Sequence, residues 1–228
     1  MSWRCTGQTN AELVNNLFRN GLIKSERVRN AFNAVDRGHF SKAEPYSDAP
    51  QRIGCDATIS GVAPHMHAYA AESLLPRLNP GARVLDIGSG SGYLCALFGH
   101  LVGPTGKVIG VEHIPQLVQM SEQNLRRDPL HSQMLDEGRI KMVKADGREG
   151  YPEEGPYDAI HVGAAAAGMP EKLIEQLAAP GKMFVPVSEG YNQYIYEVEK
   201  DAEGNVKKNR SHGVMYVPLT DAREYSSS

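Results

Sequence analysis

The stretch that decides the fold is VLDIGSGSG, residues 84–92, an aliphatic run that leads into a turn with alternating glycines. The aliphatic half predicts a buried strand, and SGYLCALFGHL, residues 91–101, predicts the helix after it. Glycine at positions 88, 90 and 92 lets the backbone turn tightly and approach a ligand closely. This strand, turn and helix form the strongest ligand-binding signal in the chain.

The spacing of these glycines separates two classes of cofactor. A dinucleotide fingerprint needs glycine or alanine three positions after Gly90, where this chain has Tyr93, so NAD binding is disfavoured. The order D-x-G-x-G-x-G, which begins at Asp86, resembles instead the first motif of the Rossmann-like methyltransferases. Asp86 ends the strand, where its carboxylate can accept hydrogen bonds from a hydroxyl or an amine. The alternative is an ordinary structural turn between a strand and a helix.

Two more acids follow the next two predicted strands. Glu112 lies at the end of KVIGVEH, and Asp146 closes RIKMVKAD. Three successive strands then each end in an acid, at the edge where open α/β sheets bind ligands. In the methyltransferases that this pattern resembles, the second acid holds the ribose of S-adenosylmethionine and the third approaches the adenine amine. Taken singly, each acid is more often a surface turn residue.

The order of the predicted elements indicates an α/β fold. Short aliphatic runs at residues 82–88, 107–113, 139–146, 157–163 and 181–187 are each followed by a helical or turn segment. Such alternation predicts a Rossmann-like, mostly parallel sheet with helices on both faces. The next two runs, YNQYIYEVEKD (191–201) and VMYVPLTD (214–221), have no helix between them and predict an antiparallel hairpin.

The N-terminal part predicts a helical flank. Thr9 and Glu12 have the spacing of a capping box, and Gly21 is placed to end that first helix. A second helix from Ser25 puts four apolar residues on one face. Residues 38–64 are rich in glycine, proline, serine and aspartate and are expected to be a long irregular segment.

One domain is expected to span residues 1–228. Its parts are the N-terminal helices with the active-site loop (1–64), the Rossmann-like core (65–190), the C-terminal hairpin (191–225) and a disordered tail (226–228).

Composition restricts the classes of partner. The formal net charge is −3 with acids and bases interspersed, so we expect binding neither to nucleic acid nor to membranes. Cys5, Cys55 and Cys95 form no CxxC pair, which argues against disulfides and zinc and favours a reducing, cytoplasmic setting. No apolar run is long enough to span a bilayer. We expect a monomer, because no coiled-coil pattern or long apolar stripe is evident.

The segment ATISGVAPHMHAYAAESLL, residues 57–75, gives the resemblance a family. It resembles the protein-L-isoaspartate (D-aspartate) O-methyltransferases, in which a TIS triplet is followed by a proline and, in animal forms, by PHMHA. The motifs DIGSGSG, GKVIG, DGR, PYDAIHVGAAA and YVPLTD also occur in the order of that family, over nearly the whole chain.

The resemblance implies an activity. Members transfer the methyl group of S-adenosylmethionine to the free α-carboxylate of isoaspartyl residues in damaged proteins, with D-aspartyl residues as a further acceptor, and S-adenosylhomocysteine is the product. The ester closes to a succinimide that hydrolyses partly to aspartate, which is a repair process. A carboxylate is already ionised at neutral pH, so the transfer needs positioning rather than a general base.

The resemblance also implies roles for individual residues. Ser60 is the active-site residue, and Val217 and Leu219 lie beside the acceptor. The residues implied at the cofactor are Ala57, Thr58, Ile59, Ser60, His67, Asp86, Gly88, Ser89, Gly90, Gly92, Glu112, His113, Asp146, Gly147 and Thr220. Without the resemblance, Thr58 and Ser60 are simple turn or helix caps. His65 and His67 are then surface histidines, and we predict no metal.

Two other functions stay open at this point. One is methylation of RNA, DNA or a small molecule, although GAAAAG (163–168) stands where amino-group methyltransferases have an Asn/Asp-Pro-Pro-aromatic element. No Pro-Cys pair offers the nucleophile of cytosine methyltransferases either. The other is a cofactor-binding adaptor without catalysis, against which Ser60 and the three acids speak.

The chain departs from the family pattern beside the predicted serine. The usual pattern passes from TIS through one residue to proline, whereas Gly61, Val62 and Ala63 separate Ser60 from Pro64. A longer loop with a glycine can bulge without disturbing the next helix. We therefore expect Ser60 to leave the catalytic position in at least one state and to return when the acceptor binds.

Overall fold

The structure is a computed structural model that describes residues 5–54, 57–59 and 63–219. The predictions for Ser60 and its displacement, for Thr220 and for the tail lie outside these residues and remain predictions.

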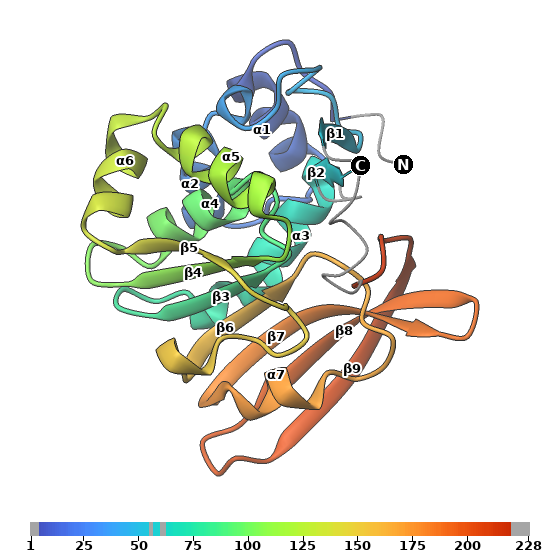
Figure 1. The fold of residues 1–228 in the computed structure, drawn as a ribbon. Coiled ribbons are helices and arrows are strands. Elements are labelled where there is room, and N and C mark those ends of the chain that lie inside the picture. Colours follow the sequence, from blue (N-terminus) through green and yellow to red (C-terminus); the bar gives the residue numbers. More distant parts are fainter. Residues whose placement is uncertain (1–4, 55–56, 60–62, 220–228) are drawn as a thin grey trace.

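A seven-stranded sheet forms the centre of the molecule, in the order β5-β4-β3-β6-β7-β8-β9 (Figure 1). Its strands are β3 (Arg83–Ile87), β4 (Lys107–Glu112), β5 (Ile140–Lys144), β6 (Tyr157–Val162), β7 (Leu177–Glu189), β8 (Asn192–Lys200) and β9 (Val206–Val214). The pairs from β5 to β7 are parallel, and β8 and β9 add antiparallel pairs. The predicted α/β class and its antiparallel end are confirmed. The strand order reverses at β3, which is where open α/β sheets bind ligands.

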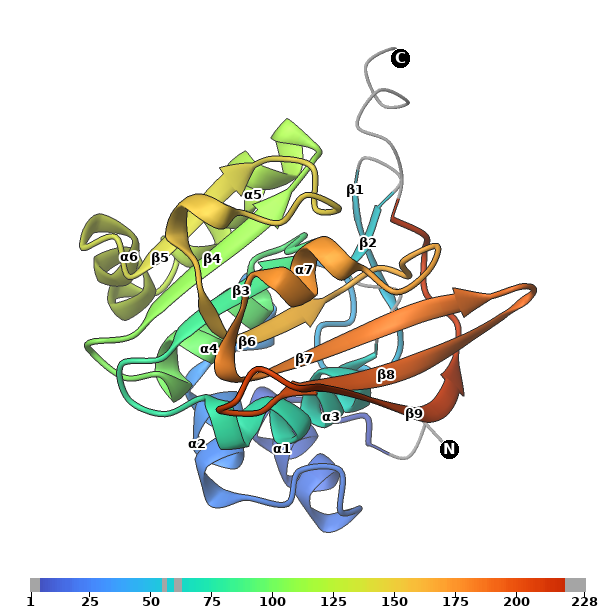
Figure 2. The ribbon, with the colours of Figure 1, turned by 90° about the horizontal axis from the view of Figure 1, so that it is seen from below.

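The helices cover the two faces of the sheet unequally. They are α1 (Asn10–Arg19), α2 (Glu26–Ala34), α3 (Pro64–Leu74), α4 (Tyr93–Leu101), α5 (Pro115–Leu125), α6 (Pro129–Asp136) and α7 (Glu171–Glu175), with short 3-10 turns η2 (Arg37–His39), η3 (Leu75–Arg77) and η4 (Pro152–Glu154). Helices α1 to α6 lie above the sheet in Figure 1, whereas α7 lies below it, as the view from below also shows (Figure 2).

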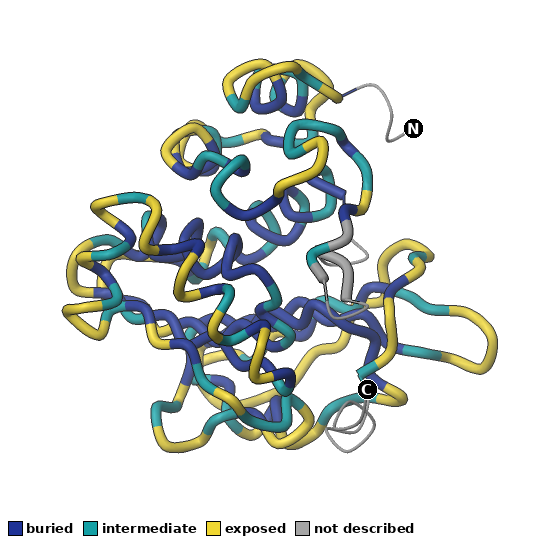
Figure 3. The backbone as a smooth tube through the Cα atoms, turned by 45° about the horizontal axis from the view of Figure 1, so that its top comes forward, coloured by how far each residue is buried: buried dark blue, intermediate teal, exposed yellow. Residues whose placement is uncertain are grey.

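Each face of the sheet has its own hydrophobic core. Successive side chains of a strand point to opposite faces, so Val84 joins the cluster under α3 and α4, while Leu85 and Ile87 join the cluster under α7. All three side chains are completely buried. Figure 3 shows the burial of the described residues, with buried backbone through the middle and exposed backbone in the outer loops. Strand β3 is thus held by packing on both of its faces.

The N-terminal helices begin where the sequence predicts. The hydroxyl of Thr9 accepts a hydrogen bond from the backbone N–H of Glu12 at 3.2 Å, and Ser25 caps α2 through Val28 N–H at 3.3 Å. Helix α2 buries its apolar face against α4, so the predicted flank packs directly on the helix that follows the glycine turn.

Two parts of the predicted secondary structure are wrong. The segment 38–64 is not wholly irregular, because it contains a small antiparallel sheet of β1 (Gln51–Gly54) and β2 (Ala57–Ile59). Among the described residues the last strand is β9, which ends at Val214, and residues 215–219 form no strand. Residues 206–213 are all exposed and polar except Val206 and Gly213, and an edge strand of that kind lacks the apolar alternation by which a strand is recognised.

A pair of histidines joins α4 to α6 in the interior. The Nε2 atoms of His100 and His131 lie 3.0 Å apart, and His131 is completely buried. Burial is the main cause that lowers the pKa of His131, from the ordinary 6.5 to about 4, and burial also lowers that of His100. Because the unfolded chain takes up the proton more readily, the pair stabilises the fold above pH 6.5 and loses that contribution as the pH falls toward 4.

We predict that His131→Phe weakens the dependence of stability on pH. The free energy of unfolding of the unchanged protein should fall by about 2 kcal/mol more between pH 7.5 and pH 5 than that of the variant, as measured by urea titration. The exposed His212 on β9 offers a control, because His212→Phe should leave the pH dependence as it was. Equal slopes for the unchanged protein and His131→Phe would contradict the prediction.

Candidate functional site

The glycine turn after β3 is tied to the neighbouring strand. The backbone N–H groups of Gly88 and Ser89 both donate to the carbonyl of Val111 in β4, at 2.8 and 3.1 Å. Gly88, Gly90 and Gly92 have φ angles of 71°, 51° and 83°. Those angles are costly for any residue with a Cβ atom, so the alternating glycines are a requirement of the turn.

Asp86 lies beneath this turn with interior partners. It is 1% exposed, its Oδ1 lies 2.7 Å from Nδ1 of His161 in β6, and its Oδ2 accepts a hydrogen bond from the thiol of Cys95 in α4 at 3.2 Å. Burial and then the nearby Asp86 raise the pKa of the Cys95 thiol well above its ordinary value, so the thiol keeps its proton. Asp86 therefore joins β3, β6 and α4, in addition to lining the cavity described below.

Glu112 ties the end of β4 to the glycine turn. Its Oε2 accepts from the N–H of Gly90 at 3.2 Å, and its Oε1 accepts from the N–H groups of His113 and Ile114 at 2.8 and 3.1 Å. The carboxylate is 5% exposed. The hydrogen bond to Glu112 is the largest cause that raises the pKa of His113.

Asp146 follows β5 and is held by a residue near it in sequence. Arg148 donates to Asp146 Oδ1 from its backbone N–H and its Nε at 3.0 Å, and to Oδ2 from Nη2 at 2.6 Å. This pairing lowers the pKa of Asp146 and keeps the carboxylate ionised. The three predicted acids thus stand at the carboxyl ends of three adjacent parallel strands.

A small cavity of about 20 Å³ lies beside the glycine turn. Its lining comes from α3, β3, the turn, α4 and β6, and consists of His67, Asp86, Gly88, Ser89, Gly90, Ser91, Tyr93, Leu94, His161 and Gly163. Among the described residues, the buried hydroxyl of Ser89 has no hydrogen-bond partner, so it is available to a ligand. His67 is 3% exposed, which overturns the interpretation of that residue as a surface histidine. His65 is half-buried, and its Nδ1 lies 2.9 Å from Oδ1 of Asp48.

The segment after β9 returns to the same edge of the sheet. Ala165, in the loop after β6, donates its N–H to the carbonyl of Val217 at 2.8 Å and accepts from the N–H of Leu219 at 2.9 Å. The same loop is bonded to β3 through Gly163 N–H and Ile87 C=O at 2.8 Å. The structure therefore brings the two predicted acceptor residues next to the strand that carries the glycine turn.

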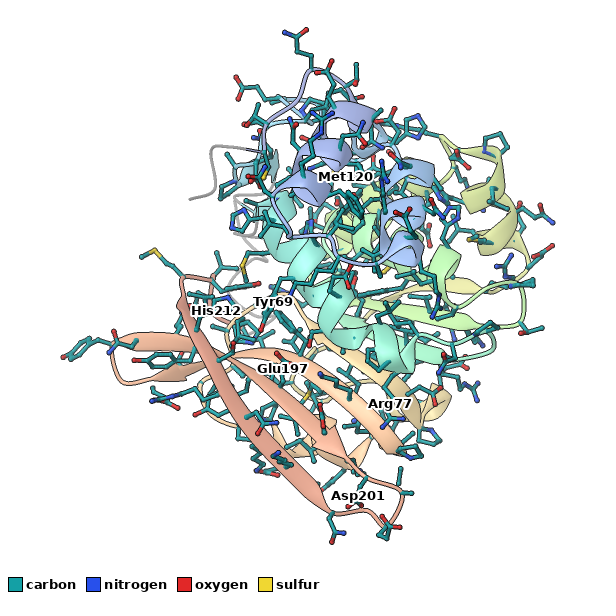
Figure 4. All side chains as sticks on the ribbon, turned by 180° about the vertical axis from the view of Figure 1, so that it is seen from behind. Tyr69, Arg77, Met120, Glu197, Asp201 and His212 are labelled. Atoms are coloured by element: carbon teal, nitrogen blue, oxygen red, sulfur yellow. The ribbon has the colours of Figure 1, made fainter. Side chains whose placement is uncertain are left out.

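A larger groove of about 410 Å³ opens between the start of α3 and the end of β9. Its lining residues are Pro50, Ala63, His65, Met66, His212, Gly213, Val214, Met215 and Tyr216. Tyr69 packs against one lining residue of the groove, because its ring contacts that of His212 (Figure 4). The Tyr69 hydroxyl donates a hydrogen bond to Glu197 at 2.8 Å. No sequence pattern indicates this groove, since its two sides are far apart in the chain.

The structure brings most of the predicted site together. The glycine turn, the three acids and His67 come from separate elements and meet at one edge of the sheet, with His113 and Gly147 next to two of the acids. For Ala57, Thr58 and Ile59 only the pairing of β2 with β1 is described. The contacts of His161 and Cys95 with Asp86 were not predicted. The one signal in the sequence was a histidine inside the otherwise apolar strand AIHV.

Two kinds of feature are absent from the described part of the chain. Within residues 5–54, 57–59 and 63–219, no three His, Cys, Asp or Glu side chains group as metal ligands would. In the same residues, no helix has the length and apolar character needed to cross a membrane.

The sheet order, the glycine turn at the reversal point and the acids on successive strands define a class I, Rossmann-like methyltransferase. The sequence profile of the protein-L-isoaspartate(D-aspartate) O-methyltransferase family matches residues 8–224. The chain belongs to that family, which confirms the predicted resemblance.

Individual relatives agree with this assignment. A protein-L-isoaspartate O-methyltransferase of Caenorhabditis elegans is 47% identical over 98% of both chains, and one of Arabidopsis thaliana is 46% identical over 92% of this chain and 91% of its own. A crystal structure described as a protein-L-isoaspartate O-methyltransferase of Plasmodium falciparum, in complex with S-adenosyl-L-homocysteine, superposes with a TM-score of 0.85. It is 36% identical and covers 94% of this chain and 99% of its own.

Gly147 provides a test of packing at the site. A Cβ atom added there would lie 2.5 Å from Cγ2 of Ile87, the last residue of β3, whereas one added at Gly168 would meet nothing within 4 Å. We predict that Gly147→Ala lowers the free energy of unfolding by about 1 to 3 kcal/mol in urea titrations. The matched variant Gly168→Ala should change it little. Equal stabilities of the two variants would show that the edge of the sheet is looser than described.

Proposed function

We propose that this protein transfers the methyl group of S-adenosylmethionine to the free α-carboxylate of isoaspartyl residues in damaged proteins and peptides, with S-adenosylhomocysteine as the product. The observation that carries the proposal is the family match, which spans the glycine turn, the acids and the groove together. The ester would begin repair when a backbone amide nitrogen attacks it and expels methanol, which closes the succinimide. We further propose that the enzyme is a cytoplasmic monomer that acts on proteins and not on nucleic acid or membranes, in keeping with its interspersed charges.

The residues at the carboxyl edge of β3 and β4 fit the cofactor. Gly88 to Gly92 expose backbone for close approach, and the Ser89 hydroxyl has a free hydrogen-bonding position among the described residues. Glu112 would accept the ribose hydroxyls, and Asp146 with Gly147 would lie at the adenine. When bound, the cofactor supplies an electrophilic methyl group on a sulfonium. The family likeness adds Ala57, Thr58, Ile59, His67, His113 and Thr220 to the residues that contact it.

The groove between α3 and β9 suits the peptide that carries the acceptor. It continues at Tyr216 into the segment that holds Val217 and Leu219 beside the end of β6. Met215 and Val217 are exposed apolar residues on this segment, at 89% and 48%. Extended backbone can pair with a peptide main chain whatever its side chains are, which a repair enzyme with many substrates requires.

The main task of the protein in this reaction is to position the acceptor carboxylate for methyl transfer. The acceptor carboxylate is ionised above about pH 4, so an in-line displacement needs no base. Neutral donors orient a carboxylate without quenching its charge, and Ser60 is the residue that we propose for this task at the acceptor. Burial keeps the pKa of His67 well below its ordinary value, so this side chain is also neutral at physiological pH.

The proposal predicts a strict preference for the damaged peptide. A pair of peptides that differ only in having isoaspartate or aspartate at one position should be assayed with cofactor labelled in the methyl group. We expect base-labile ester on the isoaspartyl peptide and, under the same conditions, close to none on its twin. Equal labelling of both peptides, labelling of RNA instead, or no transfer to any acceptor would overturn the proposed function.

Glu112 supports a second prediction. Glu112→Gln should weaken the binding of S-adenosylhomocysteine about tenfold in isothermal calorimetry, because hydrogen bonds from the ligand to a charged acceptor would be lost. Glu122→Gln is the matched control, since this residue lies on the exposed side of α5. An affinity that is the same in all three proteins would remove Glu112 from the cofactor site.

A further inference from the structure

Arg37 is a completely buried arginine next to the site, at the start of η2. Its Nη1 lies 3.1 Å from Nδ1 of His67, and its guanidinium carbon lies 5.0 Å from the centre of the Tyr93 ring. Among the described residues, its Nε and Nη2 have no hydrogen-bond partner. Burial lowers the pKa of Arg37 and the charges of Tyr93 and Asp48 oppose this, but among the described residues no carboxylate forms an ion pair with Arg37. A buried guanidinium without such a pair is unfavourable for folding, so its position calls for another explanation.

The contact with Arg37 decides where the proton of His67 lies. A guanidinium has only donors, so Nδ1 of His67 must accept the hydrogen bond. The single ring proton of a neutral imidazole is then on Nε2. Burial lowers the pKa of Arg37, but arginine starts so high that it stays charged.

The surroundings also keep His67 neutral. Burial is the largest cause that lowers its pKa, followed by the charges of Arg37, His161 and His65. Asp86, which lines the same cavity, has its two oxygens engaged by His161 and Cys95. Tyr93 does not offer a negative charge, because burial raises its pKa to about 12.

Arg37 and His67 both contact the aromatic ring of Tyr93. The rings of His67 and Tyr93 are 5.3 Å apart, and the guanidinium of Arg37 lies over the same Tyr93. Tyr93 is the first residue of α4, directly after the glycine turn, and Phe32 and Phe40 contact it edge-on. The orientation of His67 is therefore set relative to the turn that receives the cofactor.

We propose that Arg37 is a positioning residue that holds His67 as a neutral imidazole with its proton on Nε2, so that His67 is a hydrogen-bond donor for a carboxylate in the site. The inference rests on the proposed function, in which the cofactor and the acceptor each carry a carboxylate. The opposite tautomer would present a lone pair at Nε2 and repel that carboxylate. A cationic His67 would neutralise the nucleophile if the carboxylate is that of the acceptor.

The test reads the tautomer directly. The ¹⁵N chemical shifts of His67 in protein labelled at histidine, identified by their loss in His67→Gln, should show a neutral ring protonated on Nε2 from pH 5.5 to pH 8. In Arg37→Met the single tautomer should be lost and the pKa of His67 should rise, because the charge of Arg37 is one of the causes that lower it. Arg37→Lys, which retains a donor and a charge, should restore the tautomer.

Kinetics then identify the carboxylate. In Arg37→Met, a Kd for S-adenosylhomocysteine raised about tenfold would assign it to the cofactor, and a KM for the isoaspartyl peptide raised about tenfold would assign it to the acceptor. The raised constant should recover in part as the pH falls and His67 of the variant becomes cationic, because an imidazolium donates from both ring nitrogens. Arg77→Met, in η3 at the other end of α3, is the control and should alter neither constant.

Several results would overturn the proposal, and they are independent of the acceptor specificity. These are a ring of His67 protonated on Nδ1 or cationic at pH 6.5 in the unchanged protein, or unaltered shifts and constants in Arg37→Met. The first measurement decides the question even if Arg37→Met does not fold. If the enzyme methylates some other acceptor, the proposed function fails while the nitrogen shifts still report the state of His67.

Discussion

The buried carboxylate of Asp86 joins three elements that lie at different places in the sequence. Its two oxygens are bonded to His161 of β6 and to Cys95 of α4, while its backbone belongs to β3. Ionised groups are rarely this far from water unless they are bonded in this way. The contact sets how β3, β6 and α4 meet, and the glycine turn begins two residues later. The edge of the sheet that carries the glycine turn depends on this one side chain.

The remaining acids act in the same manner, since each is bonded to the backbone or to a neighbouring side chain as well as being available to a ligand. Glu112 accepts from Gly90, and Asp146 is held by Arg148. A ligand that binds here therefore meets carboxylates whose directions are already fixed. Pre-oriented groups lose little conformational freedom on binding, which favours both affinity and the alignment needed for methyl transfer.

The sequence predicts the central part of the fold well because its signals are local. The strand and glycine turn around Gly88 need particular φ angles, and the caps at Thr9 and Ser25 act within one helical turn. Predictions failed where the determinants are distant in the chain. Strand β9 is polar because it is an edge, and the burial of Arg37 and His67 follows from contacts between η2, α3 and α4 that no local pattern encodes.

The bonds between Ala165 and the segment Val217 to Leu219 have a consequence for the order of events during synthesis. That segment leaves the ribosome after every described strand of the sheet, yet it is hydrogen-bonded to the loop after β6, which is itself bonded to the end of β3. A nascent chain can assemble the sheet and the glycine turn while this segment is still missing. Under the proposed acceptor role of Val217 and Leu219, competence to receive a damaged peptide would come late in biogenesis, after the glycine turn has formed.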